Sequence, residues 1–194
     1  MLKINPIEIK GNWHYGVALD AHTISSEYLG TDAFGHDLFD TQRSPLGELL
    51  YRLKYGNDKS GIDEIVETVI NSTRWENIDV ILPVPPSNLN RRFQPVFEIA
   101  TELGKRLKRK VCFTAIKKIK ETPELKNVED LAKRPEILAD AFEVDGTEVE
   151  GKVVLLLDDL YRSGATLNAI TRILNKAGVK QVNVLALTRT RSRA

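Results

Sequence analysis

The fold is decided by five aliphatic residues, two aspartates and a short polar loop, which read Val153-Val154-Leu155-Leu156-Leu157-Asp158-Asp159-Leu160-Tyr161-Arg162-Ser163-Gly164-Ala165-Thr166. An uninterrupted aliphatic run is typical of a strand buried on both faces, as in parallel sheets. Apolar residues at helical spacing follow over residues 165–176, and Gly178 is a good helix stop. The segment therefore predicts a strand that leads directly into a helix.

The same alternation of strand and helix extends outward from this segment. Further strands are expected at residues 78–82, 111–116, 141–144 and 182–187, and further helices at residues 45–55, 62–72 and 95–107. Strands that alternate with helices form parallel sheets with right-handed crossovers. We predict a doubly wound, mostly parallel α/β domain over residues 45–194.

Residues 1–44 have a different pattern. Residues 7–28 alternate as β-structure does, around Trp13 and Tyr15. We predict a small irregular or hairpin-rich N-terminal appendage, which covers an edge of the core or contacts a second copy in a homodimer.

The composition excludes several classes of protein. Hydrophobic residues make up 42% of the 194 residues, too many for a disordered chain, and charged residues make up 28%. Neither a membrane span nor a signal peptide is expected, because the longest aliphatic run has only five residues. The single Cys112 cannot form an internal disulfide. These features favour a cytoplasmic protein.

The loop after the aliphatic run predicts a phosphate site. Gly164 permits close backbone approach, Ser163 and Thr166 supply hydroxyls, and the first turn of a helix presents unpaired N–H groups. Asp158 and Asp159 would repel a phosphate unless they accept hydrogen bonds from sugar hydroxyls or meet a divalent cation. A phosphorylated sugar is therefore the expected ligand; the alternative is that the aspartates only cap the helix.

This segment resembles the phosphoribosyl pyrophosphate (PRPP) signature of type I phosphoribosyltransferases, which usually reads Asp-Asp-x-x-Thr-Thr-Gly-x-Thr. Arg162 and Ser163 stand where threonines are commonest. The resemblance implies that Asp158 and Asp159 are the catalytic pair that holds the ribose hydroxyls. It also implies that the 5-phosphate is bound by the loop of Arg162, Ser163, Gly164, Ala165 and Thr166, and that Mg²⁺ arrives with PRPP rather than on a protein metal site.

The resemblance extends to the ComF-type branch of the family over about residues 45–190. Leu46–Tyr55 is similar to the helix before its first core strand, Pro83–Ser87 to its Pro-Val-Pro loop, and Arg91–Gln94 to its Arg-Gly-Phe-Asn segment. Arg134, eight residues before Phe142, fits the later pattern. ComF-type proteins commonly begin with a cysteine-rich zinc ribbon, which this chain lacks.

Two further groups of residues are implied to contact the pyrophosphate. The first is a pyrophosphate loop made of Val84, Pro85, Pro86, Ser87, Arg91 and Arg92. The second is a mobile hood within residues 117–140, with Lys117, Lys118, Lys120 and Arg134 as candidates. Guanidinium groups bridge phosphate oxygens well. A rigid surface turn and solvated surface charges are the alternatives.

Net charge alone says little about partners, since 28 Lys and Arg oppose 27 Asp and Glu. Residues 91–134 nevertheless hold 13 basic and six acidic residues. This basic segment favours either a nucleic-acid contact or an anion-attracting hood. The three histidines lie in residues 1–44 without the spacing of a metal site.

Two functions follow. The first is a PRPP-binding phosphoribosyltransferase that releases pyrophosphate and whose acceptor is unknown, with a nucleobase as one possibility. The alternative is a non-catalytic protein of the same fold that handles DNA during competence or senses nucleotides.

Overall fold

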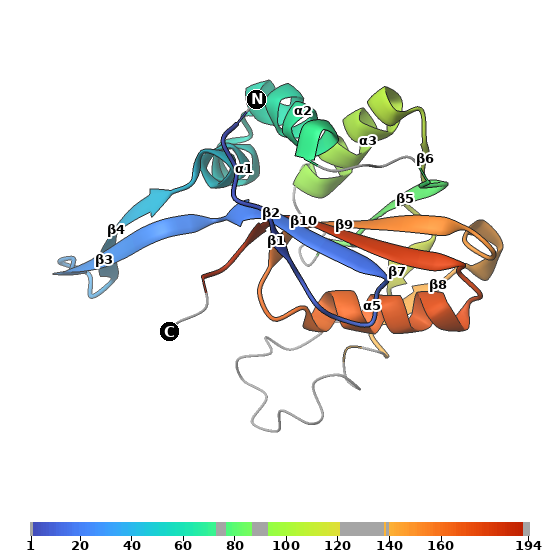
Figure 1. Cartoon of the computed structure of the whole chain (residues 1–194). Helices are drawn as coiled ribbons and strands as arrows, with labels where there is room; N and C mark the ends of the chain where they lie inside the picture. The colour runs from blue at the N-terminus through green and yellow to red at the C-terminus, as the bar shows by residue number, and fades with distance from the viewer. Residues whose placement is uncertain (1, 73–76, 87–92, 121–137, 139, 192–194) are drawn as a thin grey trace.

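A computed structural model describes residues 2–72, 77–86, 93–120, 138 and 140–191. Its centre is a mostly parallel sheet (Figure 1). The strands lie in the order β1 (Ile7–Glu8), β2 (Tyr15–Ala21), β10 (Gln181–Arg189), β9 (Val153–Tyr161), β5 (Val80–Pro83) and β6 (Lys110–Val111). Only β1 pairs in antiparallel fashion within this described sheet. The aliphatic strand β9 is thus central, as the sequence predicts.

Helices cover both faces of the sheet, which confirms the doubly wound α/β prediction (Figure 1). On one face lie α1 (Pro45–Gly56), α2 (Ile62–Ser72) and α3 (Pro95–Leu107). On the other lies α5 (Ala165–Lys176). The alternation of side chains along β9 builds both cores: Val154 and Leu156 pack with α5, whereas Leu155 and Leu157 pack with α1–α3.

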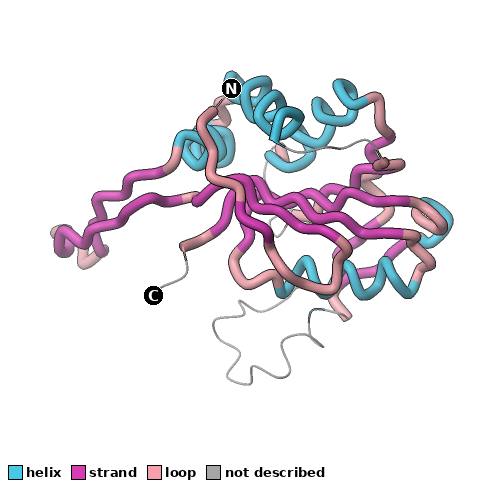
Figure 2. The backbone as a smooth tube through the Cα atoms, in the orientation of Figure 1, coloured by secondary structure: helices cyan, strands magenta, loops and turns pink. Residues whose placement is uncertain are grey.

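Residues 1–44 differ from the prediction in part. Strands β1 and β2 belong to the central sheet, and β2 covers the edge of β10 with Leu185 opposite Val17. The hairpin predicted for this region is formed by β3 (Thr23–Thr31) and β4 (Asp37–Arg43), which project away from the sheet (Figures 1 and 2). Only the hairpin is therefore an appendage, because the backbone of β2 pairs with an otherwise open edge of the sheet.

The hairpin exposes an unusual share of large apolar side chains. Six of them are at least 43% exposed, namely Ile24, Tyr28, Leu29, Phe34, Leu38 and Phe39. At its base the hydroxyl of Ser44 accepts a hydrogen bond from the backbone of Gly47 and caps α1. Gly47 also approaches the carbonyl of His22 so closely that a larger residue would not fit. These contacts fix where α1 lies over the sheet.

The strand predicted at residues 111–116 is divided in the structure. Lys110 and Val111 form β6, and the chain then leaves the sheet at Phe113, whose ring packs on Phe97. The remainder becomes β7 (Ile116–Lys118), which pairs antiparallel with β8 (Phe142–Val144). Short 3₁₀ turns at Lys59–Gly61 and Gly146–Glu148 complete the described elements. Within these ranges no helix is both long and apolar enough to cross a membrane.

Candidate functional site

The two aspartates lie within β9 rather than after it, since the strand continues to Tyr161. Successive side chains of a strand point to opposite faces. Asp159 therefore follows Leu155 and Leu157 toward the α1–α3 face, and Asp158 follows Val154 and Leu156 toward the α5 face.

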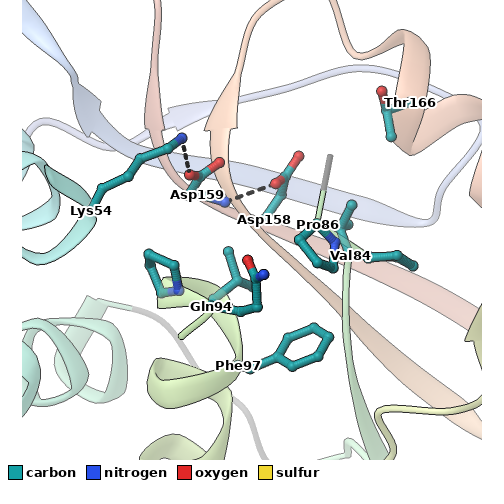
Figure 3. Close-up of a pocket in the computed structure, with 11 residues that line it drawn as sticks. Lys54, Val84, Pro86, Gln94, Phe97, Asp158, Asp159 and Thr166 are labelled. Carbon is teal, nitrogen blue, oxygen red and sulfur yellow. Dashed lines mark hydrogen bonds and ion pairs between the residues drawn. The ribbon is translucent and has the colours of Figure 1, made fainter. Parts of the chain in front are cut away.

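Asp159 is held by a lysine that the sequence analysis did not select. The ammonium of Lys54, in the last turn of α1, lies 2.8 Å from the Asp159 carboxylate oxygen Oδ2 (Figure 3). The Lys54 side chain is 29% exposed and that of Asp159 is 23% exposed, so the pair is screened less than a surface ion pair. A helix far away in sequence thus supplies the positive charge of the site.

These charged groups face a pocket of about 170 Å³ at the carboxyl end of the sheet (Figure 3). Lys54, Asp158, Asp159 and Thr166 form its polar wall. The opposite wall is mainly apolar and comes from the segment after β5 and from the start of α3, with Val84, Pro85, Pro86, Gln94, Pro95, Val96 and Phe97. Ligands of open α/β sheets bind at this end.

Asp158 has an unusual proton affinity. Its burial, together with the adjacent charge of Asp159, raises the pKa of Asp158 to about 7. The backbone N–H of Asp159 donates a 2.9 Å hydrogen bond to Asp158 Oδ1 and opposes this rise, as does Lys54. Asp158 is therefore poised between carboxylic acid and carboxylate near neutral pH, a state typical of functional sites.

The predicted phosphate loop forms a second, smaller pocket of about 130 Å³. The five predicted residues 162–166 all line it, and it shares Asp158 and Thr166 with the larger pocket. Gly164 adopts φ 73° and is the N-cap of α5 without a side-chain cap bond among the described residues. The alternative that the aspartates cap this helix is therefore wrong.

Of the predicted pyrophosphate loop, the described part lies at the site. Val84, Pro85 and Pro86 line the larger pocket, and the backbone N–H of Val84 donates a 2.8 Å hydrogen bond to the carbonyl of Leu157. Ser87, Arg91 and Arg92 lie outside the described residues. The adjacency of β5 and β9 explains why residues so far apart in sequence meet here.

The hood candidates are not brought to the site where the structure describes them. Lys117 and Lys118 lie in β7, Lys120 is within 3.9 Å of Asp140, and none of the three lines either pocket in the described part of the chain. Arg134 lies outside the described residues. Closure by these side chains stays a prediction.

Two further residues, Thr188 and His22, form a chain of contacts to the backbone of Asp159. The hydroxyl of buried Thr188 donates a 3.0 Å hydrogen bond to the carbonyl of Asp159 and lies 3.1 Å from Nδ1 of His22. Burial, followed by the charge of Arg43, lowers the pKa of His22. A neutral His22 thus donates from Nδ1 to Thr188, which places this histidine beside the site rather than in a separate appendage.

The donor set fits a divalent cation only if most of its ligands come from elsewhere. No group of three or more His, Cys, Asp or Glu able to hold a metal exists among the described residues. Asp158 already accepts a backbone hydrogen bond from Asp159, and the Asp159 carboxylate is engaged by Lys54. Mg²⁺ commonly keeps waters and takes ligand phosphates beside one or two carboxylates.

Comparison with known proteins identifies the family. A family model described as a phosphoribosyl transferase domain matches residues 56–194. The chain belongs to this family. The matched range contains both pockets' strand and loop residues but leaves out Lys54, β2 and the hairpin.

Individual relatives are more distant. Competence protein ComFC of Streptococcus pneumoniae is 45% identical over 38 residues, which are 20% of this chain and 17% of that protein, and this short match supports the ComF-like resemblance. The allosteric regulatory enzyme of purine biosynthesis matches with a TM-score of 0.51 and 17% identity, over 87% of this chain and 44% of its own. This likeness supports the phosphoribosyltransferase fold.

A third comparison is with adenine phosphoribosyltransferase from Thermoanaerobacter pseudethanolicus. It has a TM-score of 0.46 and 15% identity, over 84% of this chain and 95% of its own. The chain spans less than half the length of both ComFC and the purine-biosynthesis enzyme in these matches.

Proposed function

We propose that the protein binds PRPP and transfers its 5-phosphoribosyl group to an acceptor, with release of pyrophosphate. The observation that carries the proposal is the pair of joined pockets at the carboxyl end of β9, which share Asp158 and Thr166. The smaller pocket has the loop and helix start that suit the 5-phosphate. The larger one extends from the carboxylates to the segment after β5 and the start of α3, and we assign the pyrophosphate to it.

The proposed chemistry breaks the bond between the anomeric carbon and a pyrophosphate oxygen and forms a bond from that carbon to the acceptor. In this reaction Asp158 and Asp159, as carboxylates, accept hydrogen bonds from the ribose hydroxyls and orient the sugar. They also stabilise the positive charge that develops on the ring. Magnesium bound with PRPP would be contacted by Asp158 and would neutralise leaving-group charge.

Isothermal titration with PRPP and Mg²⁺ tests binding. We expect saturable binding to the wild type and loss of at least about tenfold in affinity when Asp158→Asn and Asp159→Asn are combined, because two charge-assisted hydrogen-bond acceptors are replaced. Binding that survives this double substitution would refute the proposal. A pyrophosphate-release assay with candidate nucleobases then tests turnover.

A second candidate function is a DNA-handling role, which the short match to ComFC favours. The described basic residues give it limited support. Lys105 and Arg106 pair with Glu102, and Lys110 pairs with Glu148, so much of this positive charge is neutralised within the chain. Salt-dependent DNA affinity, lost on neutralising Lys105, Arg106, Lys108, Arg109 and Lys110, together with PRPP binding without turnover, would favour this role over transfer.

A further inference from the structure

The charge of the larger pocket raises a question that the phosphate loop does not answer. Two carboxylates face this pocket, and yet the proposed ligand places its most anionic group there. Among the described residues that line it, Lys54 is the only cationic side chain. Arg162 lines only the smaller pocket. Lys54 is therefore the described group that is able to offset the charge of a pyrophosphate.

The position of Lys54 agrees with this role. In Figure 3 Lys54 and Thr166 lie on opposite sides of the two carboxylates. If the 5-phosphate occupies the loop of residues 162–166, the ribose lies over Asp158 and Asp159, and the anomeric carbon points to the remaining part of the larger pocket. Lys54 lines the larger pocket and not the smaller one, so it lies on the side of the carboxylates away from the loop.

The Lys54 ammonium has more hydrogen-bond donors than its contact with Asp159 uses. It carries three N–H groups, and the structure assigns one of them to Asp159 Oδ2 at 2.8 Å. The α1 helix that carries it is fixed by the Ser44 cap and by the close contact of Gly47 with His22. The ammonium is thus held at the pocket wall, and within the described ranges no acceptor other than Asp159 is recorded for its remaining two donors.

We propose that Lys54 is a specificity-determining binding residue that holds the pyrophosphate end of the ligand and so distinguishes PRPP from ribose 5-phosphate. This inference rests on the proposed PRPP site. In the ligand-free protein the same ammonium neutralises Asp159. On binding it bridges Asp159 and the pyrophosphate, while Asp159 accepts a ribose hydroxyl.

The test is the ratio of the Kd for ribose 5-phosphate to the Kd for PRPP, measured by titration with Mg²⁺ present. We expect Lys54→Met to weaken PRPP binding by about 10- to 100-fold, because a charge-assisted contact is lost, and to weaken ribose 5-phosphate binding by less than about threefold. Lys54→Arg keeps the charge and should keep the ratio within about threefold. Lys59→Met is the matched control, since Lys59 pairs with Glu98 and lines neither pocket.

A double variant separates direct contact from screening. Lys54→Met with Asp159→Asn leaves the formal charge of the pocket as in the wild type. If Lys54 contacts the pyrophosphate, the ratio in the double variant stays as low as in Lys54→Met alone. If Lys54 only screens Asp159, the ratio returns to the wild-type value, and the inference is overturned.

The remaining outcomes also decide the matter. If the wild type binds PRPP and Lys54→Met leaves the ratio unchanged, the inference about Lys54 is overturned but the proposed function is not. A wild type that binds neither ligand overturns the proposed function, and the role of Lys54 falls with it. Thermal melting checks that each variant is folded, and Lys54→Gln carries the same test if the methionine variant is unstable.

Discussion

The buried hydroxyl of Thr188 donates a 3.0 Å hydrogen bond to the carbonyl oxygen of Asp159 and thereby joins strand β10 to the site residue of strand β9. The oxygen of the same hydroxyl lies 3.1 Å from His22 Nδ1. Thr188→Val should therefore destabilise the protein by about 1–3 kcal/mol, because the half-buried Asp159 carbonyl and His22 ring nitrogen both lose this partner. Urea unfolding measures this loss.

Thr171 provides the matched control for that substitution. It is as buried as Thr188, but its hydroxyl has no hydrogen-bond partner among the described residues. Thr171→Val should change the free energy of unfolding by less than about 0.5 kcal/mol or stabilise the fold, since a group without a partner is replaced by an apolar one. Equal losses in the two variants would contradict the role assigned to Thr188.

Gly164 is the residue of the proposed phosphate loop that tolerates least change. Its φ of 73° is strained for any residue with a side chain, and a Cβ would lie 2.8 Å from a ring carbon of Tyr161. Gly164→Ala should cost about 1–2 kcal/mol for the backbone conformation and more for the contact. It should also weaken PRPP binding, because the loop must move to relieve the contact.

Gly151, at the other end of β9, isolates the effect of the contact. Its φ is 69°, and a Cβ there would meet nothing within 4 Å. Gly151→Ala should therefore carry only the backbone cost and leave ligand affinity unchanged. Unfolding curves and PRPP titrations of both variants check this; a Gly164→Ala variant no weaker than Gly151→Ala would exclude crowding by Tyr161.

The sequence predicted those features that depend on local pattern. The helix at Pro95–Leu107 and the helix at Ala165–Lys176 have the predicted bounds, because proline at a helix start and glycine after a helix end act within one turn. Strand β9 was predicted to end at Leu157 but continues to Tyr161. Asp is normally depleted in strands. Here the two aspartates lie at the carboxyl end of the sheet, where their side chains line the pocket.

The features that the sequence could not predict depend on contacts between distant segments. Lys54 and Asp159 are 105 residues apart and meet only because α1 crosses the carboxyl end of the sheet. Lys54 belongs to the segment that resembles the ComF-type helix before the first core strand, but nothing in the segment distinguishes it from a solvated lysine. Likewise, β2 joins the sheet through β10, a pairing across the whole length of the chain.

Asp158 should make stability depend on pH. Its pKa of about 7 in the folded protein is above the ordinary value near 4, so the folded state binds more protons than the unfolded state between these values. Stability contributed by this group is present below about pH 4 and is lost as the pH rises to 7. We expect the stability advantage of Asp158→Asn over the wild type to grow by on the order of 2 kcal/mol between pH 5 and pH 8, and to vanish only below about pH 4.

Thermal melting of both proteins across this range, at constant ionic strength, measures the difference. Asp79→Asn is a useful comparison, because Asp79 accepts a hydrogen bond from the backbone of Val153 at the opposite end of β9, far from the pocket. A stability difference between wild type and Asp158→Asn that stays constant from pH 5 to pH 8 would be inconsistent with the raised pKa.

The same ionisation should control ligand affinity. Only the carboxylate form of Asp158 accepts a hydrogen bond through both oxygens, and that form grows from roughly a tenth to nine tenths of the molecules between pH 6 and pH 8 for a pKa of about 7. PRPP affinity should therefore rise about tenfold over this interval. Titration calorimetry at fixed Mg²⁺ measures this rise in affinity. Asp158→Asn should bind PRPP more weakly at every pH, and its affinity should change with pH only through the ionisation of the ligand's own phosphates. Parallel profiles for the two proteins would mean that Asp158 does not bind the sugar as a carboxylate.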